Sequence, residues 1–148
     1  MTLLAATLAS RLHAGQVDKQ GAPYIDHLTA VVGILRERWP EAPPHALEAA
    51  WLHDAMEDTG ASAESLRAEG VSEEAIQLVQ LLTKPAGAIY QDWIAALAAS
   101  GDLWAIRVKL ADNAHNSMPE RAIPDMVERR YGPARERLEA AERGSDGR

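Results

Sequence analysis

Apolar residues recur at helical spacing along most of the chain, and no stretch shows the alternating pattern of a β-strand. Glycine and proline divide this pattern into short segments, and serine or aspartate stands where several segments begin. We therefore expect an all-α fold, a single-domain helical bundle over residues 1–143, followed by a disordered tail at 144–148. The expected helices cover residues 2–14, 25–39, 43–58, 62–70, 72–82, 90–100, 102–116 and 124–143.

Composition limits the chemistry that the chain can perform. Its 148 residues contain no cysteine, which excludes disulfides, thiolate nucleophiles and cysteine-ligated zinc, so any metal would be held by histidine and carboxylate side chains. The formal net charge of −7 argues against a nucleic-acid-binding or membrane-binding surface, although a few local cations could still hold a small phosphorylated substrate. No uncharged apolar run approaches the roughly 18 residues that span a bilayer, and the N-terminus lacks the basic start of a signal peptide. We therefore expect a cytoplasmic protein, and its oligomeric state stays open.

Four ionisable residues crowd the end of the expected third helix: His53, Asp54, Glu57 and Asp58. We expect this helix to continue without a break until Thr59. Residues four apart share a helix face, so the first two residues would lie directly over the two acids that follow one turn later. Three carboxylates so close repel one another unless a cation lies among them, and acids are disfavoured at the C-terminal end of a helix. A solvated acidic helix end is the alternative, but this pattern favours a metal site.

Two other stretches could complete such a site. His27 borders the apolar face of the expected second helix, where a hydrogen-bonded core histidine is the alternative to a metal ligand. Asp112 lies in an apolar part of helix 102–116, with Asn116 one turn later and Lys109 one turn before. A buried carboxylate without a partner is costly, so Asp112 needs one. That partner could be a metal ion, or alternatively Lys109 or Arg107 on a partly solvated face.

Three blocks of sequence carry a resemblance to a known family. They are Gln16-x-x-Lys19-x-Gly21-x-Pro23-Tyr24-Ile25-x-His27, Ala50-x-Leu52-His53-Asp54-x-x-Glu57-Asp58-Thr59 and Val108-Lys109-Leu110-Ala111-Asp112-x-x-His115-Asn116. In this order and spacing the blocks resemble the HD-domain metal-dependent phosphohydrolases, and in particular the hydrolase half of RelA/SpoT-type alarmone enzymes. The length of the chain is similar to that of the stand-alone small alarmone hydrolases. The resemblance implies an HD-type helical bundle.

The same resemblance implies a set of functional residues. One Mn²⁺ ion would be bound by His27, His53, Asp54 and Asp112. Two imidazoles and two carboxylates suit a borderline-hard divalent ion and leave positions for water and a phosphate oxygen. Glu57 and Asp58 match the acidic pair of the family, which would orient or deprotonate the attacking water. The implied substrate contacts are Lys19, Tyr24, Lys84, Asn116 and Tyr131, and for Lys84 and Tyr131 a solvated surface position is the alternative.

We therefore expect a Mn²⁺-dependent hydrolase that releases pyrophosphate from the 3′ position of (p)ppGpp-like nucleotides and acts on no nucleic acid or membrane. Two departures bear on the base. Asp18 stands where the family often has arginine, and Ser117-Met118 follow Asn116 where the family tends to have an arginine. The alternatives among enzymes are therefore an adenine alarmone of the ppApp type as substrate, or removal of a single phosphate from a nucleotide such as NADPH. A non-catalytic nucleotide-sensing module is the alternative of another class.

Overall fold

The computed structural model describes residues 3–146, and within this range the fold is all-α, as expected. Its helices are α1 (Leu3–Leu12), α2 (Tyr24–Arg38), α3 (Pro44–Leu52), α4 (Ala55–Asp58), α5 (Ala63–Ala68), α6 (Glu73–Leu82), α7 (Tyr90–Ala99), α8 (Leu103–Asn116), α9 (Pro124–Met126) and α10 (Gly132–Asp146). A π-helical segment, η1 (Val127–Tyr131), joins the last two. Among the described residues β geometry is limited to one isolated bridge, between Val17 and Pro23.

Side-chain caps begin three of these helices where the sequence predicts them. The side chains of Ser62, Ser72 and Asp102 each accept a hydrogen bond from the backbone N–H three residues later, at the starts of α5, α6 and α8. Each cap satisfies one of the N–H groups that a helix leaves without an intrahelical partner. The cap at Asp102 begins α8, the helix that also carries Asp112.

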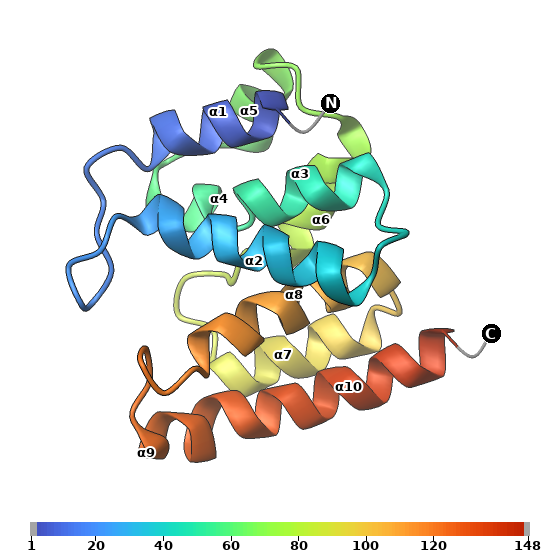
Figure 1. The fold of residues 1–148 in the computed structure, drawn as a ribbon. Helices are drawn as coiled ribbons and strands as arrows, with labels where there is room; N and C mark the ends of the chain where they lie inside the picture. Colours follow the sequence, from blue (N-terminus) through green and yellow to red (C-terminus); the bar gives the residue numbers. More distant parts are fainter. Residues whose placement is uncertain (1–2, 147–148) are drawn as a thin grey trace.

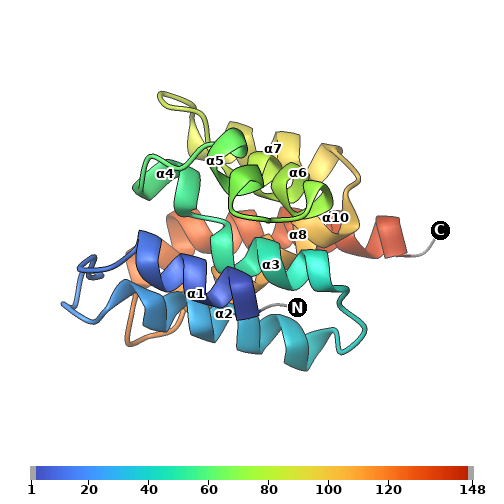
Figure 2. The ribbon, with the colours of Figure 1, turned by 90° about the horizontal axis from the view of Figure 1, so that it is seen from above.

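Helix α8 occupies the centre of the fold. It packs against α2 on one side and α10 on the other, and α3 lies against both α2 and α6 (Figure 1). Seen from above, α1, α2 and α3 lie together, with α6 and α7 on the far side of α3 (Figure 2). The core consists mainly of leucine, isoleucine, valine and alanine, yet α8 also buries the polar side chains of Arg107, Asp112 and Asn113. Polar groups in a core need partners, so these residues point to the site.

The expected third helix is interrupted at His53 and Asp54, so its predicted continuity to Thr59 is wrong. The Nδ1 atom of His53 donates a hydrogen bond of 2.8 Å to the carbonyl oxygen of Ala50. In an uninterrupted helix that carbonyl would accept the backbone N–H of Asp54 instead. The backbone of Asp54, at φ −99° and ψ −1°, departs from ideal helical angles, and α4 starts immediately after it. The break lies before Asp54, since the backbone N–H of Asp58 still donates to the carbonyl of Asp54 at 3.0 Å, as one helical turn requires.

The expected last helix is interrupted as well. In η1 the N–H of Gly132 donates to the carbonyl of Val127, five residues earlier, which is the hydrogen bond of a π-helix. Pro133, the next residue, has no N–H to donate, so the sequence itself prevents a regular ladder here. A Cβ atom at position 132 would lie 2.8 Å from the carbonyl oxygen of Val127, which explains why glycine occupies this position.

Helix α10 runs further than the sequence indicates. It continues to Asp146 and not only to the expected end at residue 143, so residues 144–146 of the expected tail are helical in this structure. The last two residues of that expected tail, 147–148, lie outside the described residues.

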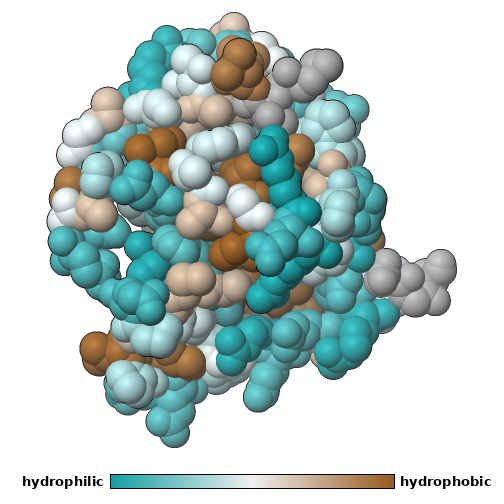
Figure 3. Space-filling model, viewed as in Figure 1, coloured by the Kyte–Doolittle hydropathy of each residue, from teal (hydrophilic) through white to brown (hydrophobic). Residues whose placement is uncertain are grey.

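Within the described part of the chain no helix is long and apolar enough to cross a bilayer. On the face seen in Figure 3, hydrophilic residues predominate and the hydrophobic ones are scattered among them.

Candidate metal centre and active site

Four side chains that are far apart in the sequence converge at the middle of the bundle. His27 comes from α2, His53 and Asp54 from the break between α3 and α4, and Asp112 from α8. One potential ligand atom from each lies within 4.8 Å of all the others. We call these four residues the histidine–aspartate cluster. Their convergence matches the set of metal ligands that the resemblance implies.

The cluster is held together by contacts to its two carboxylates. Oδ1 of Asp112 lies 2.9 Å from Nε2 of His27 and 3.2 Å from Nε2 of His53. Oδ2 of Asp54 lies 3.1 Å from the same nitrogen of His53 and 4.0 Å from that of His27. Both histidines and Asp112 are at most 3% exposed. Such a concentration of buried ionisable groups requires a shared proton or cation among them.

Electrostatic interactions within the cluster favour ionised groups. Burial alone would raise the pKa of Asp112, but the positive charge of Lys109 and hydrogen bonds from the two histidines outweigh it and lower that pKa well below its usual value. Burial likewise opposes ionisation of Asp54, whose pKa falls to about 2 because of the charge and hydrogen bond of His53. The pKa of His53 is raised despite burial, because the charges of Asp54 and Asp112 favour its protonated form. Two carboxylates are thus held as anions around the histidine nitrogens.

The outer nitrogens of the two histidines support the metal-ligand geometry. Because Nδ1 of His53 donates to the carbonyl of Ala50, its Nε2 can present a lone pair to a metal. Nδ1 of His27 lies 2.7 Å from Nδ1 of His115. Burial, reinforced by the charges of His27 and Arg121, lowers the pKa of His115 to about 4, so at neutral pH its imidazole is neutral and its Nδ1 can accept a hydrogen bond from Nδ1–H of His27. A divalent cation can therefore replace the protons between these groups, and the donor set of two nitrogens and two carboxylates fits it.

Asp112 pairs with Lys109, one of the partners considered from the sequence, and its other oxygen faces the histidines. Its Oδ2 accepts a hydrogen bond of 2.8 Å from Nζ of Lys109, while its Oδ1 faces the histidines. The Lys109 ammonium also lies over the ring of Trp93, 5.0 Å from its centroid. Arg107 pairs instead with Glu142. The Lys109 ion pair and a metal site are thus compatible, because they use different oxygens of one carboxylate.

The two expected catalytic acids lie beyond the cluster, each fixed by one contact. Oε1 of Glu57 accepts a hydrogen bond of 2.6 Å from the backbone N–H of Lys84. Burial raises the pKa of Glu57, and the charge of Asp54 adds to this effect. Oδ2 of Asp58 accepts a hydrogen bond of 3.1 Å from Nε2 of Gln16. Glu57 and Asp58 are the last two residues of α4, the short helix that begins directly after the break at His53 and Asp54.

Asp58 is the end of a short hydrogen-bonded chain that sequence reasoning missed. Oε1 of Gln16 accepts from Nδ1 of His13 at 2.7 Å, and the amide of Gln16 then donates to Asp58. His13 is 3% exposed and its ring lies 5.1 Å from that of Tyr24. The loop after α1 therefore holds one of the expected catalytic groups. Gln16 begins the first of the three sequence blocks, and that was the one available signal.

Two cavities adjoin the cluster. The first, of about 280 Å³, we call the loop cavity; it is lined by Val17, Asp18, Lys19, Gln20, Tyr24, Asn116, Arg121 and Tyr131. The second, of about 140 Å³, we call the lysine cavity; it is lined by Tyr24, Asp54, Glu57, Leu82, Lys84, Tyr90, Trp93, Lys109, Asp112, Asn116 and Arg130. Tyr24 and Asn116 line both. A ligand could therefore extend from one cavity to the other past the cluster.

The expected substrate-binding residues divide between these cavities. Lys19 and Tyr131 line the loop cavity, and Lys84 lines the lysine cavity. The Tyr24 hydroxyl donates a hydrogen bond to Asp54, and the amide of Asn116 donates one of 3.3 Å to Asp112. The two residues shared by the cavities are thus bonded directly to the cluster. Nζ of Lys84, in contrast, donates to carbonyls of its own loop, including that of Ala88 at 3.1 Å.

Three cations of the cavities were not assigned from the sequence. Lys109 and Arg130 line the lysine cavity, and Arg130 lies over the ring of Tyr90 at 3.9 Å from its centroid. Arg121 lines the loop cavity and pairs with Asp18 at 3.0 Å. Lys109 was considered from the sequence only as a partner of Asp112, not as a cavity residue. Arg130 directly precedes Tyr131, which was the one signal for it, and Arg121 lies in a stretch without a motif.

Comparison with known proteins agrees with this geometry. A family model described as an HD domain matches residues 5–89. The chain is 36% identical over 141 residues to a probable GTP pyrophosphokinase of Mycobacterium leprae, covering 89% of this chain and 17% of that protein. It is 35% identical over 128 residues to a probable guanosine-3′,5′-bis(diphosphate) 3′-pyrophosphohydrolase of Synechocystis, covering 80% of this chain and 16% of that protein. The chain thus spans about a sixth of the length of these relatives.

A solved structure has the same fold. It is that of a metazoan ortholog of SpoT, described as hydrolysing ppGpp and playing a role in starvation responses. Its TM-score to this chain is 0.81 at 24% sequence identity, and the match covers 97% of this chain and 86% of the other. The arrangement of helices described above is therefore that of a known fold.

Proposed function

The chain belongs to the HD-domain family, and on that premise we propose that it is a metal-dependent hydrolase that releases pyrophosphate from the 3′ position of (p)ppGpp-like nucleotides. The observation that carries the proposal is the histidine–aspartate cluster, whose four ligand atoms converge beside two cavities. Relatives that align with most of this chain include 3′-pyrophosphohydrolases of guanosine-3′,5′-bis(diphosphate), from Synechocystis among others. We propose Mn²⁺ as the metal, since mixed imidazole and carboxylate ligands suit it.

The proposed chemistry needs an activated water and charge neutralisation. A bound divalent ion would lower the pKa of a coordinated water and neutralise charge on the phosphate. Glu57 is suited to receive a proton, because its raised pKa brings it closer to neutral pH than an ordinary carboxylate. Asp58, fixed by Gln16, would orient the same water. No protein nucleophile is required, because phosphoryl transfer depends chiefly on positioning and electrostatics.

The lysine cavity is the proposed phosphate side of the site. Lys84, Lys109 and Arg130 bring three cations to one small cavity that also reaches Asp54 and Asp112. Arg130 has no carboxylate partner among the described residues, so its guanidinium is available to a phosphate oxygen. We place the nucleoside in the loop cavity, against Tyr24, Asn116 and Tyr131, with Lys19 at its edge.

The first experiment is an assay of ppGpp turnover with added Mn²⁺ and with chelator, following nucleotide and pyrophosphate together. Metal-dependent formation of GDP and pyrophosphate is the expected result. Release of orthophosphate would instead identify a phosphomonoesterase, and turnover of ppApp alone would identify an adenine alarmone as substrate. Mn²⁺ and nucleotide binding without any turnover would favour the non-catalytic sensing module. Absence of metal binding would overturn the proposal altogether.

Substitution of Asp58 tests the acidic pair separately from the metal. Asp58→Asn should retain Mn²⁺ and nucleotide binding while turnover falls by roughly a hundredfold or more, the usual scale for loss of a general base. Asp125→Asn is a matched control, because that exposed carboxylate pairs with Arg129 and lines neither cavity. Unchanged turnover in Asp58→Asn would remove Asp58 from the mechanism.

A further inference from the structure

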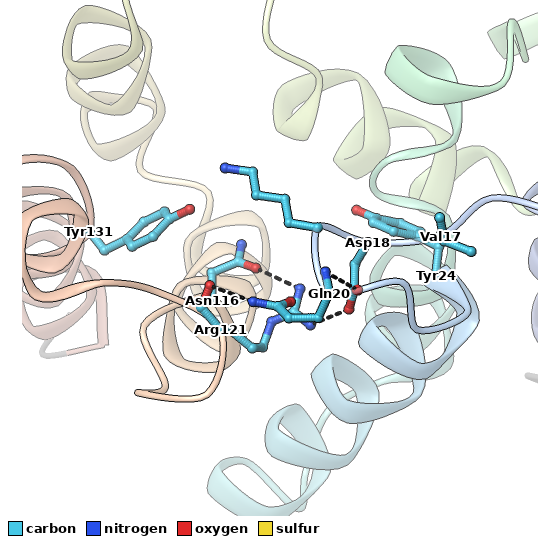
Figure 4. A pocket seen from close by; sticks show the side chains of 8 residues that line it. Val17, Asp18, Gln20, Tyr24, Asn116, Arg121 and Tyr131 are labelled. Carbon is cyan, nitrogen blue, oxygen red and sulfur yellow. Dashed lines mark hydrogen bonds and ion pairs between the residues drawn. The ribbon is translucent and has the colours of Figure 1, made fainter.

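The floor of the loop cavity is an ion pair between two loops. NH1 of Arg121, in the loop after α8, lies 3.0 Å from Oδ2 of Asp18, in the loop before α2. Gln20 joins the same two loops by donating to the carbonyl of Arg121 at 3.4 Å. Figure 4 shows Tyr131 and Tyr24 on opposite sides of the cavity, with these polar residues and Asn116 between them. A polar floor between aromatic sides suits a flat heterocycle.

The carboxylate of Asp18 is already occupied and is not available to a ligand. Its Oδ1 accepts the backbone N–H groups of Gln20 and Ala22 at 2.9 and 3.0 Å, and its Oδ2 accepts from Arg121. Its side chain is 8% exposed. Asp18 therefore shapes its own loop and holds a guanidinium in place. It is a positioning residue for Arg121.

Arg121, in contrast, retains donors. NH1 is bonded to Asp18 and NH2 reaches Oδ1 of Asn116 at 3.4 Å, a long contact, so each terminal nitrogen keeps a second N–H for a ligand, whereas Nε is buried. The charge of Arg121 is neutralised by Asp18, so this pair offers N–H groups without a net positive charge, and Lys19 is the other cation that lines the loop cavity. Such a group suits a neutral acceptor better than a phosphate, for which the lysine cavity provides cations.

The hydrogen-bond acceptors of the purine then determine whether Arg121 favours guanine or adenine. Guanine presents two acceptors, O6 and N7, on one edge, and arginine can donate to both at once. Adenine has an amino donor in place of O6, which would face the N–H groups of the guanidinium. We propose that Arg121, positioned by Asp18, selects a guanine base over an adenine base in the loop cavity. This inference rests on the proposed function. It assigns recognition of the base to Arg121, because Asp18 stands at the position where the family often has arginine.

The test compares kcat/KM for ppGpp and ppApp in the full chain loaded with Mn²⁺. Arg121→Lys keeps the charge and the pairing with Asp18 but loses the planar fork of donors. Asp18→Asn keeps an acceptor for the two backbone N–H groups but removes the carboxylate that holds Arg121. Arg129→Lys is the matched control, since Arg129 is exposed and lines neither cavity. Affinities for GDP and ADP, measured by calorimetry, give a second readout that needs no turnover.

We expect the wild-type protein to prefer ppGpp. The preference should fall roughly tenfold in Arg121→Lys, fall in the same direction in Asp18→Asn, and stay unchanged in Arg129→Lys. A wild-type preference for ppApp, or a ratio that neither variant changes, would overturn the inference. If neither nucleotide is turned over, the proposed reaction fails, and the affinities for GDP and ADP then test the role of Arg121. Tighter binding of GDP than ADP that is lost in Arg121→Lys upholds its role, and equal binding overturns it.

Discussion

Asp58 and Gln16 illustrate how a single side chain can depend on a distant one. A carboxylate that must orient water needs a fixed rotamer, and Asp58 has its contact from Gln16, 42 residues earlier in the chain. Gln16 in turn is held by His13, whose ring is almost completely buried. The donated hydrogen bond also compensates part of the cost of keeping this carboxylate near Asp54 and Glu57. We infer that Gln16 positions Asp58 without touching the substrate.

Replacement of Gln16 by leucine should therefore lower kcat without changing binding. Leu is close in size but cannot donate to Asp58, so the carboxylate would no longer be fixed. We expect kcat for ppGpp to fall by about ten- to a hundredfold, because small misplacements of a catalytic group have effects of this order. KM and the affinity for Mn²⁺ should stay within about twofold of wild type, since the cluster is untouched. Gln77→Leu, at an exposed position of α6, is the control. An equal loss in both variants, or a loss of Mn²⁺ binding, would contradict this role.

At this scale, the residues that converge could be predicted where chemistry demands particular residue types. The cluster could be predicted because two histidines and two aspartates occur in recognisable blocks, and an aspartate in an apolar helix needs a partner. The contact between Asp18 and Arg121 could not, because it joins residues 103 apart and neither belongs to a helix pattern. Such pairings depend on how two loops are brought together, which residue periodicity does not encode.

At the scale of elements, positions of helices followed from periodicity, but two interruptions within them did not. Residues on both sides of His53 continue the same apolar spacing, so the pattern alone indicates one helix. The break arises from a side-chain hydrogen bond to Ala50, and it turns Asp54 toward the cluster. The π-helical segment before Pro133 also preserves the apolar pattern on either side. Both irregular points lie next to site residues, since Tyr131 is the last residue of η1.

The π-helical segment makes a prediction about stability. Gly132→Ala would place a Cβ 2.8 Å from the carbonyl oxygen of Val127, and backbone atoms cannot easily move away. We expect the free energy of unfolding to fall by about 1–3 kcal/mol, the usual cost of overpacking. Gly33→Ala is the matched comparison, because a Cβ added to this glycine of α2 would meet no neighbouring atom within 4 Å, and alanine favours helix by roughly 1 kcal/mol. In chemical denaturation, the free energy of unfolding should therefore decrease for Gly132→Ala and increase for Gly33→Ala. Destabilisation by Gly33→Ala as large as that by Gly132→Ala would argue against a steric cause.

At the scale of the whole molecule, the fold and the site share the same central helix. The packing of α8 against α2 brings Asp112 to His27, and its packing against α3 brings Asp112 to His53. Metal binding would therefore join α2, the α3–α4 break and α8, and it should stabilise the fold as well as enable chemistry. Without a metal, the same groups must be held by protons.

Those protons give the stabilisation by metal a definite pH dependence. In metal-free protein the pKa of His53 is raised above 6.5, so its contribution to stability is complete below that value and is lost as pH rises through the folded pKa. The pKa of Asp54 is lowered from 3.8 to about 2, so its contribution is present above 3.8 and is lost as pH falls toward 2. The cluster therefore stabilises the metal-free fold most between about pH 4 and 6.5.

A metal needs the lone pair of His53, so it competes with the proton that stabilises the metal-free state. We expect the rise in Tm caused by a fixed concentration of Mn²⁺ to be larger at pH 8 than at pH 6, and calorimetry to record proton release on binding. Asp112→Ala should abolish the rise at both pH values, because it removes the carboxylate that both histidines contact. An equal rise in Tm at pH 6 and pH 8 for the wild-type chain would mean that no proton leaves the cluster, and that the ion is bound elsewhere. Comparison with Asp112→Ala then locates the metal, because this variant removes one carboxylate of the cluster and leaves all five histidines of the chain in place.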